Sequence, residues 1–313
     1  MDYTILGRTG LKVSVAGLGC GGPSRLGLRQ KKSEKEAVAL VRLAIDLGVN
    51  FFDTAEWYGT EPIVGAAIAE TPRDRLVIST KKTLPPMDHP DPGGEVSKSV
   101  EGSLKRLRTD YIDIYHAHGV YPGEYPYVKE RLLPAFERMR QQGKIRSVGI
   151  TERFPADPTH QILLQALQDD CWDVIMTGFN LLNPCARKTL FRLTQKQRVG
   201  VLNMYAVRRG LSQPVLLKAI CADLVKKGVA AAESLNPDDP LAFVVRDGGA
   251  TTVSEAAYRF CRHEPGVHVV LTGTGNPDHL RANVEAIMKP ALPEPVLRRL
   301  ADIFGNVDWI SGN

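Results

Sequence analysis

Residues 96–118, with the sequence VSKSVEGSLKRLRTDYIDIYHAH, join an amphipathic segment to a nearly continuous hydrophobic one. In residues 96–107, apolar side chains recur every three or four positions, which places them on one face of a helix. Residues 112–118 are mostly apolar and include β-branched side chains, as in a strand that is buried on both sides. The stretch therefore predicts a helix followed by a strand of a parallel sheet.

The same alternation extends in both directions along the 313-residue chain. Eight strand-like segments occur, at 13–18, 50–54, 76–80, 112–118, 145–150, 172–177, 200–205 and 267–272. Amphipathic segments lie between them, including 34–47, 128–141, 159–167 and 278–288. Eight such units close into a barrel more readily than they form an open sheet, so we predict an α/β fold, a (β/α)8 TIM barrel. A doubly wound open sheet is the alternative.

Three other stretches complete the predicted architecture. Residues 3–6 and 11–13 flank the turn-forming 7–10, which predicts an N-terminal β-hairpin that plugs one mouth of the barrel. Residues 82–94 and 228–252 are rich in turn-forming residues or have little periodicity, and we expect them to be loops over one end. Because no linker-like segment interrupts the chain, we expect residues 1–313 to form a single domain.

Composition excludes several functional classes. No apolar run reaches the roughly 18 residues that span a bilayer, and a net charge of +5 is too small for a typical nucleic-acid-binding protein. The five cysteines contain no Cys-x-x-Cys pair, which argues against a disulfide framework or a zinc ribbon and favours the reducing cytoplasm. We therefore expect a soluble, cytoplasmic protein that binds a small molecule and neither nucleic acid nor membrane. The sequence does not indicate an oligomeric state.

Polar side chains end three consecutive predicted strands. In barrels of this kind, functional residues lie at the C-terminal ends of the strands, and here these ends carry Asp53, Lys81 and His118, with Tyr58 in the turn after Asp53. A buried lysine is costly unless it is paired, so we expect Asp53 to be the partner of Lys81. The ammonium would then lower the pKa of the Tyr58 phenol toward the range where general acid catalysis works.

The same residues also allow other interpretations. Asp53 is a possible helix cap, Tyr58 a packed aromatic residue and Lys81 a solvated loop residue. His116 and His118 have the spacing of a metal-binding pair, but no third ligand is placed near them, so we predict no metal site. A lyase that forms a Schiff base at Lys81 would use the same strand end.

An ordered series of motifs resembles the aldo-keto reductases over nearly the whole chain. These motifs are LGRTGLKVS at 6–14 with GLG at 17–19, NFFDTAEWYG at 50–59 with VGAA at 64–67, DYIDIY at 110–115 before His118, and GKIRSVGIT at 143–151. The resemblance implies a nicotinamide cofactor that lies extended across the C-terminal mouth of the barrel. It also implies a tetrad in which Tyr58 is the general acid, Lys81 and Asp53 tune it, and His118 orients the carbonyl group of the substrate.

Further cofactor contacts follow from the resemblance and from helix chemistry. Asn276 is expected to cap a helix after the last strand, whose N-terminus suits a phosphate. At the nicotinamide, Thr151 keeps a hydroxyl, whereas Glu152 and Met176 replace the family's usual amides, and Tyr205 is expected to stack on the ring. The other expected cofactor contacts are Gly19, Cys20, Asn180, Arg208, Arg209, Gly273, Thr274, Gly275, His279 and Asn283.

The expected reaction is hydride transfer between a nicotinamide and a small carbonyl compound. His279 stands where many relatives have an arginine for the 2′-phosphate, so we expect NADPH as the cofactor with a modest preference, and NADH stays open. Aromatic walls of the substrate pocket are expected from Trp57, Tyr121, Tyr125 and Trp309. The alternative function is a non-catalytic, cofactor-binding regulatory subunit that resembles channel-associated relatives.

Overall fold

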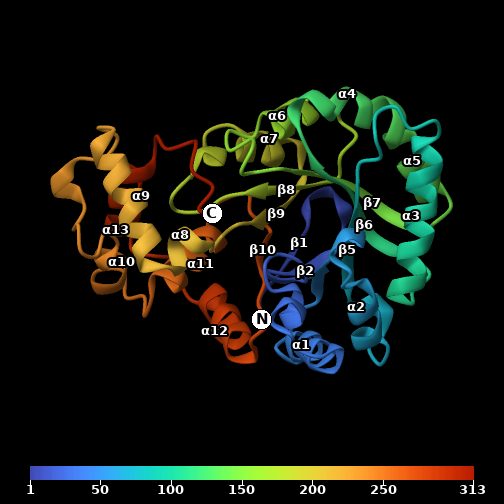
Figure 1. The fold of residues 1–313 in the computed structure, drawn as a ribbon, viewed down its shortest axis with the longest axis horizontal. Coiled ribbons are helices and arrows are strands. Elements are labelled where there is room, and N and C mark those ends of the chain that lie inside the picture. Colours follow the sequence, from blue (N-terminus) through green and yellow to red (C-terminus); the bar gives the residue numbers. More distant parts are fainter.

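The computed structural model describes residues 1–313, except for the side chain of Ala232. Within these residues, eight parallel strands close into a barrel: β3 Ala16–Gly19, β4 Phe51–Asp53, β5 Val77–Thr83, β6 Ile112–Val120, β7 Ile145–Glu152, β8 Val174–Gly178, β9 Gly200–Met204 and β10 Val269–Thr272. The strands follow the order of the chain, and β10 pairs with β3 to complete the ring (Figure 1). The predicted (β/α)8 barrel is confirmed.

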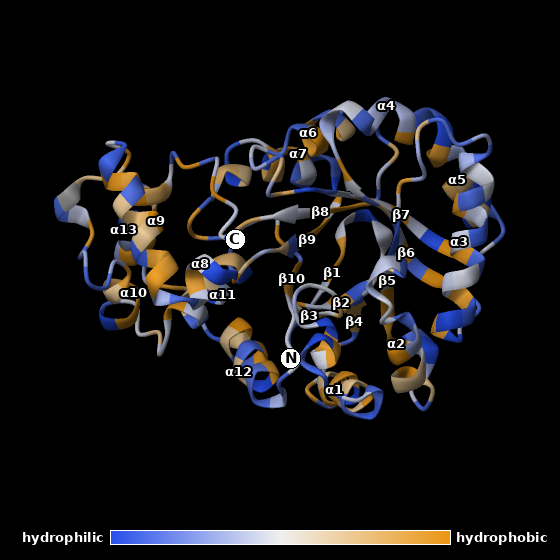
Figure 2. Ribbon diagram, viewed as in Figure 1, coloured by the Kyte–Doolittle hydropathy of each residue, from blue (hydrophilic) through white to orange (hydrophobic). Residues whose placement is uncertain are grey.

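Helices surround the barrel. They are α1 Glu34–Asp46, α2 Glu61–Ile68, α3 Pro92–Leu107, α4 Tyr125–Tyr127, α5 Leu133–Gln141, α6 Gln161–Ala166, α7 Leu190–Gln197, α8 Arg209–Ser212, α9 Pro214–Lys226, α10 Ala242–Arg246, α11 Val253–Arg262, α12 Pro277–Met288 and α13 Glu294–Phe304. Short 3-10 or π turns are η1 Gly7–Thr9, η2 Arg25–Gln30, η3 Glu56–Tyr58, η4 Arg73–Arg75, η5 Pro122–Glu124, η6 Val128–Leu132, η7 Cys185–Arg187 and η8 Ala232–Ser234. In the outer helix α3, hydrophobic and hydrophilic residues follow one another in turn (Figure 2). None of the helices within the described residues is long and apolar enough to cross a membrane.

Helix α1 shows how local sequence sets an element. Ser33 caps its N-terminus, since the Ser33 hydroxyl accepts a hydrogen bond from the Glu36 N–H and the Glu36 carboxylate accepts one from the Ser33 N–H. This reciprocal capping box satisfies two backbone donors that a helix leaves open. Four residues of one face, Ala37, Leu40, Val41 and Ala44, are buried.

The N-terminal hairpin closes one end of the barrel, as the sequence predicted. Strands β1 Tyr3–Ile5 and β2 Lys12–Ser14 pair antiparallel. Leu6, which follows β1, and Val13, in the middle of β2, are buried against the barrel-interior residues Phe51 and Ile114. The prediction of one strand over 13–18 is wrong. The strand is interrupted at Val15, whose N–H donates to the Asp2 carbonyl. The stretch is therefore divided between the hairpin strand β2 and the barrel strand β3.

The stretch 228–252 is not simply a loop. It contains η8 and α10, and α10 lies with α9 and α13 at one edge of the molecule (Figure 1). The other predicted loop is confirmed in part, since residues 84–91 connect β5 to α3 without a helix or strand.

Candidate active site

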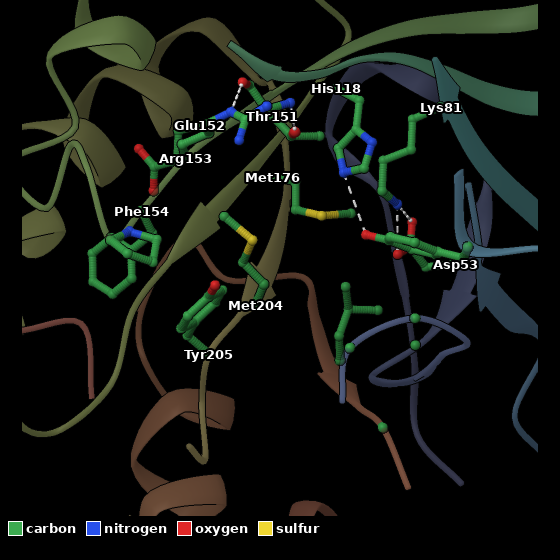
Figure 3. Close-up of a pocket in the computed structure, with 18 of the residues that line it drawn as sticks. Asp53, Lys81, His118, Thr151, Glu152, Arg153, Phe154, Met176, Met204 and Tyr205 are labelled. Atoms are coloured by element: carbon green, nitrogen blue, oxygen red, sulfur yellow. Dashed lines mark hydrogen bonds and ion pairs between the residues drawn. The ribbon is translucent and has the colours of Figure 1, made fainter. Parts of the chain in front are cut away.

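A cleft of about 840 Å³ opens at the C-terminal ends of the barrel strands. Every barrel strand contributes to its wall, through Gly19, Asp53, Lys81, His118, Thr151, Met176, Met204 and Thr272. Because parallel strands present the same ends to one side, side chains far apart in sequence meet here (Figure 3). The rim residues predicted from the sequence are therefore brought together in one cavity.

Lys81 and Asp53 form a buried ion pair at the base of the cleft. The Lys81 Nζ donates to Asp53 Oδ1 at 2.6 Å, to Asp53 Oδ2 at 2.7 Å and to the Thr54 carbonyl at 2.8 Å, which occupies all three of its protons. Asp53 Oδ1 also accepts from the Ser79 hydroxyl at 2.8 Å. Only 1% of the Lys81 side chain is exposed, so the ammonium depends on this pairing. The predicted partnership is present.

Tyr58 and His118 meet at the open side of this pair. The Tyr58 hydroxyl lies 3.3 Å from His118 Nε2, and the two rings pack edge to face with centroids 5.5 Å apart. The Lys81 Nζ lies 5.4 Å from the centre of the Tyr58 ring. A proton-bearing hydroxyl and an imidazole nitrogen thus converge on one point of the cleft, in front of a fixed cation and its counter-ion.

The electrostatics of Tyr58 differ from the expectation. Burial raises the pKa of the Tyr58 phenol, and the nearby Asp53 carboxylate raises it further, while the Arg25 guanidinium opposes them. The predicted net lowering is therefore wrong for the site as it stands, because burial and the Asp53 charge outweigh the cation of Lys81 behind the ring. Burial, with the charges of Lys81 and Arg153, lowers the pKa of His118 to about 3, so this imidazole is neutral near pH 7.

His116 lies behind the site. It is fully buried, with its Nε2 3.0 Å from the Ser79 hydroxyl, and it does not line the cleft. Among the described residues, no group of three or more potential ligands is arranged to hold a metal ion. His116 therefore supports Ser79, which in turn contacts Asp53.

Gly21 is a residue of the site that was not predicted from the sequence. It lines the cleft, and a Cβ atom placed on it would overlap three atoms of the Tyr58 ring. Only a residue without a side chain lets the phenol occupy its observed place. The sequence signal was the glycine cluster 17–22, which begins within the first barrel strand and continues past its end.

Gly21→Ala is therefore expected to displace the Tyr58 ring and to lower kcat by roughly 10²-fold, as ångström-scale misplacement of a reacting group can do. Steady-state kinetics and chemical unfolding of the variant would measure this. Gly123→Ala is the matched control, because a Cβ at Gly123 meets no atom within 4 Å. Equal kcat in the two variants would contradict the placement of Tyr58.

The expected cofactor residues fall into two groups. Gly19, Thr151, Tyr205, Arg208 and Gly273 line the cleft. The other expected contacts lie outside its wall: Cys20, Asn180, Arg209, Thr274, Gly275, Asn276, His279 and Asn283. The structure therefore brings together only part of the predicted cofactor set.

Several of the outlying side chains have partners within the chain. The Asn180 amide donates to the Tyr205 carbonyl at 3.2 Å and to the Ser311 carbonyl at 3.3 Å, and Asn283 donates to the Thr272 hydroxyl at 2.8 Å. Asn276 caps α12 as predicted, since its side chain accepts from the Asp278 N–H at 2.8 Å. In the structure, Asn180 and Asn283 therefore hold neighbouring segments together, and Asn276 caps the first turn of α12.

Two of the four predicted aromatic walls belong to the cleft. Trp57 and Tyr121 line it, with 66% and 39% of their surfaces exposed. The prediction for Tyr125 and Trp309 is wrong, because neither lines the cleft. Tyr125 is buried, and its hydroxyl donates to Asp169 at 2.7 Å, whereas the ring of Trp309 lies 6.0 Å from the Lys227 ammonium.

Glu152 and His160 form a second buried ion pair beside the cleft, which the sequence did not indicate. Both oxygens of the Glu152 carboxylate lie 3.0 Å from His160 Nδ1, and Oε1 also accepts from the Gly178 N–H and the Thr177 hydroxyl. Burial disfavours the charged imidazole, but the Glu152 carboxylate outweighs it and raises the pKa of His160 to about 10. The pair holds the end of β7 against β8.

This pair predicts a pH-dependent stability. A histidine in an unfolded chain titrates near pH 6.5, so the contribution of the pair is complete below that pH and is lost as pH rises toward about 10. We expect the free energy of unfolding to fall across this range by more in the parent protein than in His160→Gln. Urea unfolding at several pH values measures both slopes, and parallel slopes would contradict the assignment.

Comparisons with known proteins show what the chain is similar to. The sequence model of the aldo/keto reductase family matches residues 17–303. The chain is 33% identical to the L-galactose dehydrogenase of Arabidopsis thaliana over 218 residues, 67% of each protein. It is 35% identical to the uncharacterized oxidoreductase YrpG of Bacillus subtilis (strain 168), with 97% of this chain and 96% of that one covered.

A solved structure extends the likeness to three dimensions. The aldo-keto reductase AKR11C1 from Bacillus halodurans in its holo form is 25% identical and superposes with a TM-score of 0.74, over 97% of this chain and 96% of that one. The match to this family identifies an oxidoreductase of the kind that uses a nicotinamide cofactor. The chain belongs to the aldo/keto reductase family.

Proposed function

We propose that this protein is a cytoplasmic, NADP(H)-dependent enzyme that reduces an aldehyde or ketone, or oxidises the matching alcohol or sugar. The observation that carries the proposal is the convergence of the Tyr58 hydroxyl and His118 Nε2, 3.3 Å apart, above the buried Lys81–Asp53 pair. The five cysteines are all free thiols, which suits the reducing cytoplasm.

The residues at the mouth fit a nicotinamide cofactor. Tyr205 offers an aromatic surface beside Met204, and its ring is itself stacked by the Arg208 guanidinium at 4.4 Å. Gly273 and Gly19 leave their backbones exposed to a ligand, and a Cβ on Gly273 would already lie 3.0 Å from the Gly19 carbonyl. Tyr205 would hold the nicotinamide and Arg208 the pyrophosphate. A bound reduced nicotinamide supplies the hydride.

The residues of the chain supply the proton and the orientation. The raised pKa of Tyr58 keeps its phenol protonated, so the hydroxyl can donate to a carbonyl oxygen that accumulates negative charge. His118, being neutral, can donate from Nε2 to the same oxygen and fix its position. Lys81, held by Asp53, places a cation behind the phenol, where it stabilises the phenolate that remains after transfer.

The test is an absorbance assay of NADPH consumption with aryl aldehydes, sugars and lactones as substrates. We expect turnover of at least one carbonyl class. Tight NADPH binding without turnover of any compound would instead support the alternative function, a regulatory cofactor-binding subunit. A carbonyl compound trapped on Lys81 by borohydride without cofactor would indicate a lyase.

The cofactor preference depends on the N-terminus of α12. Its backbone N–H groups favour an anion, and His279 lies exposed in its first turn, but Asp278 adds a negative charge. We therefore propose a preference for NADPH over NADH of about tenfold, equivalent to about 1.4 kcal/mol. Dissociation constants for both cofactors at two pH values test this, and tighter NADH binding at both would overturn it.

A further inference from the structure

The cleft carries more positive charge than its own carboxylates can balance. Four arginines line it: Arg25, Arg29, Arg153 and Arg208. The two carboxylates that line it, those of Asp53 and Glu152, are paired with Lys81 and His160 instead. Four guanidinium groups therefore surround the cavity without a carboxylate of the cleft wall opposite them. A ligand with negative charge would complete this electrostatic arrangement.

Arg25 lies close to the proton donor. It begins η2, the turn after β3, and its guanidinium stacks on the exposed Trp57 ring at 4.8 Å. Burial and Asp53 raise the pKa of the Tyr58 phenol, and Arg25 is the cation that opposes them, so its charge is felt at that hydroxyl. Arg25 thus lies on the Tyr58 side of the cleft.

Arg153 occupies the corresponding place near His118. It follows the last residue of β7, its Nε donates to the Gly119 carbonyl at 2.7 Å, and its guanidinium stacks on the Tyr121 ring at 4.8 Å. After burial and Lys81, Arg153 is a further cause of the lowered pKa of His118. Figure 3 shows Arg153 at the cleft with His118 beyond it.

Both arginines are held before any substrate arrives. A guanidinium stacked on an aromatic ring keeps its planar N–H groups in a restricted orientation, so less entropy is lost when it binds an anion. Such groups bind carboxylate and phosphate through two parallel hydrogen bonds. Arg208 differs, because its Nε contacts Asn313 and its guanidinium stacks on Tyr205, on the side that we assign to the cofactor.

We propose that Arg25 and Arg153 bind an anionic group of the substrate, so that the preferred substrate is an aldehyde or ketone that carries a carboxylate or a phosphate. The proposal rests on the proposed function, because it assigns the substrate class of the same site. Trp57 and Tyr121 act here as supports for the two guanidinium groups as well as walls of the pocket.

Matched pairs of compounds test the proposal. The carboxylate pair is 4-formylbenzoate and its neutral methyl ester, and the phosphate pair is glyceraldehyde 3-phosphate and glyceraldehyde. For at least one pair, we expect kcat/KM to be about tenfold or more higher for the charged member, with the two pairs distinguishing carboxylate from phosphate. Equal kcat/KM within both pairs would overturn the proposal and leave the proposed function intact.

Variants locate the effect. Arg25→Gln and Arg153→Gln should each raise KM for the preferred charged compound by about 10- to 100-fold and leave KM for its neutral counterpart little changed. Because Arg25 also acts on Tyr58 and Arg153 on His118, any change in kcat should be common to both compounds. Arg299→Gln is the control, since Arg299 stacks on Phe243 at 4.1 Å but does not line the cleft. If Arg299→Gln raises KM by the same factor, or if KM rises equally for the charged and the neutral compound, Arg25 and Arg153 do not bind the anionic group.

Two binding measurements separate the remaining outcomes. The dissociation constant of NADPH, measured by its fluorescence, should be unchanged in both variants, and weaker NADPH binding with an unchanged substrate ratio would assign the arginines to the cofactor instead. Calorimetric titration of the NADP-loaded protein with terephthalate, an unreactive dianion, should show binding that each variant weakens. If no carbonyl compound is turned over, the proposed function fails, while terephthalate binding still decides whether the anion site exists.

Discussion

Tyr58→Phe should lower kcat by about 10²- to 10⁴-fold while the dissociation constant of NADPH stays nearly constant. The substitution keeps the ring that packs against His118 and Gly21 and removes only the hydroxyl that lies 3.3 Å from His118 Nε2. Without it, the developing negative charge on the carbonyl oxygen has no proton donor. Steady-state kinetics with a fluorescence titration of NADPH give both quantities.

Tyr127→Phe is the control for this substitution. Its hydroxyl donates to the carbonyl groups of Pro85 and Pro86 in a loop, and Tyr127 does not line the cleft. We expect this variant to keep the parent kcat. If Tyr58→Phe also turns over at the parent rate, Tyr58 is not the general acid.

Lys81→Met is expected to have the largest effect on stability and a severe effect on activity. It leaves the nearly buried Asp53 carboxylate without its counter-ion, and breaking a buried pair in this way costs about 3–5 kcal/mol. The uncompensated carboxylate would also raise the pKa of Tyr58 further, since Asp53 already raises it. The acidic group that controls the pH profile of kcat should therefore move upward or leave the accessible range.

A double-mutant cycle with Asp53→Asn tests whether the two residues act as a unit. The double variant should be little worse in kcat, and little less stable, than either single variant. Lys81→Met alone leaves a buried carboxylate without its cation, and Asp53→Asn alone leaves a buried ammonium opposite a neutral amide. The exposed pair Arg42–Glu70, with a 3.0 Å contact, is a control whose cycle should give at most about 1 kcal/mol. Strictly additive losses for Asp53 and Lys81 would show that they are not coupled.

The sequence predicted most of the fold, because continuous apolar segments and amphipathic helices are local patterns. The segments 112–118 and 145–150 became β6 and β7 with nearly the same bounds. The meeting of Asp53, Lys81 and His118 could be predicted for a similar reason, since a polar residue near the end of an apolar strand is visible in sequence and the barrel brings all strand ends together. The division of 13–18 into β2 and β3 depends on tertiary contacts at Val15, which no local pattern reveals.

The rest of the site depends on contacts between distant segments. Glu152 pairs with His160 across a loop in which His160 itself has a φ of 63°, and nothing in the sequence marks this conformation. The stacks of Arg25 on Trp57 and Arg153 on Tyr121 each join two different loops. The pKa shift of Tyr58 was predicted in the wrong direction because burial and the position of the Asp53 charge depend on the assembled cavity.

Isotope labelling distinguishes direct hydride transfer from the nicotinamide from other routes to the alcohol. The protein is incubated with a carbonyl compound that it turns over and with NADPH that carries deuterium at the transferable position, and the product is analysed by mass spectrometry. Direct hydride transfer in the Tyr58 cleft predicts an alcohol with one deuterium on the former carbonyl carbon, formed far more slowly by Tyr58→Phe but with the same label. An alcohol without deuterium, or equal rates for the two proteins, would contradict the account.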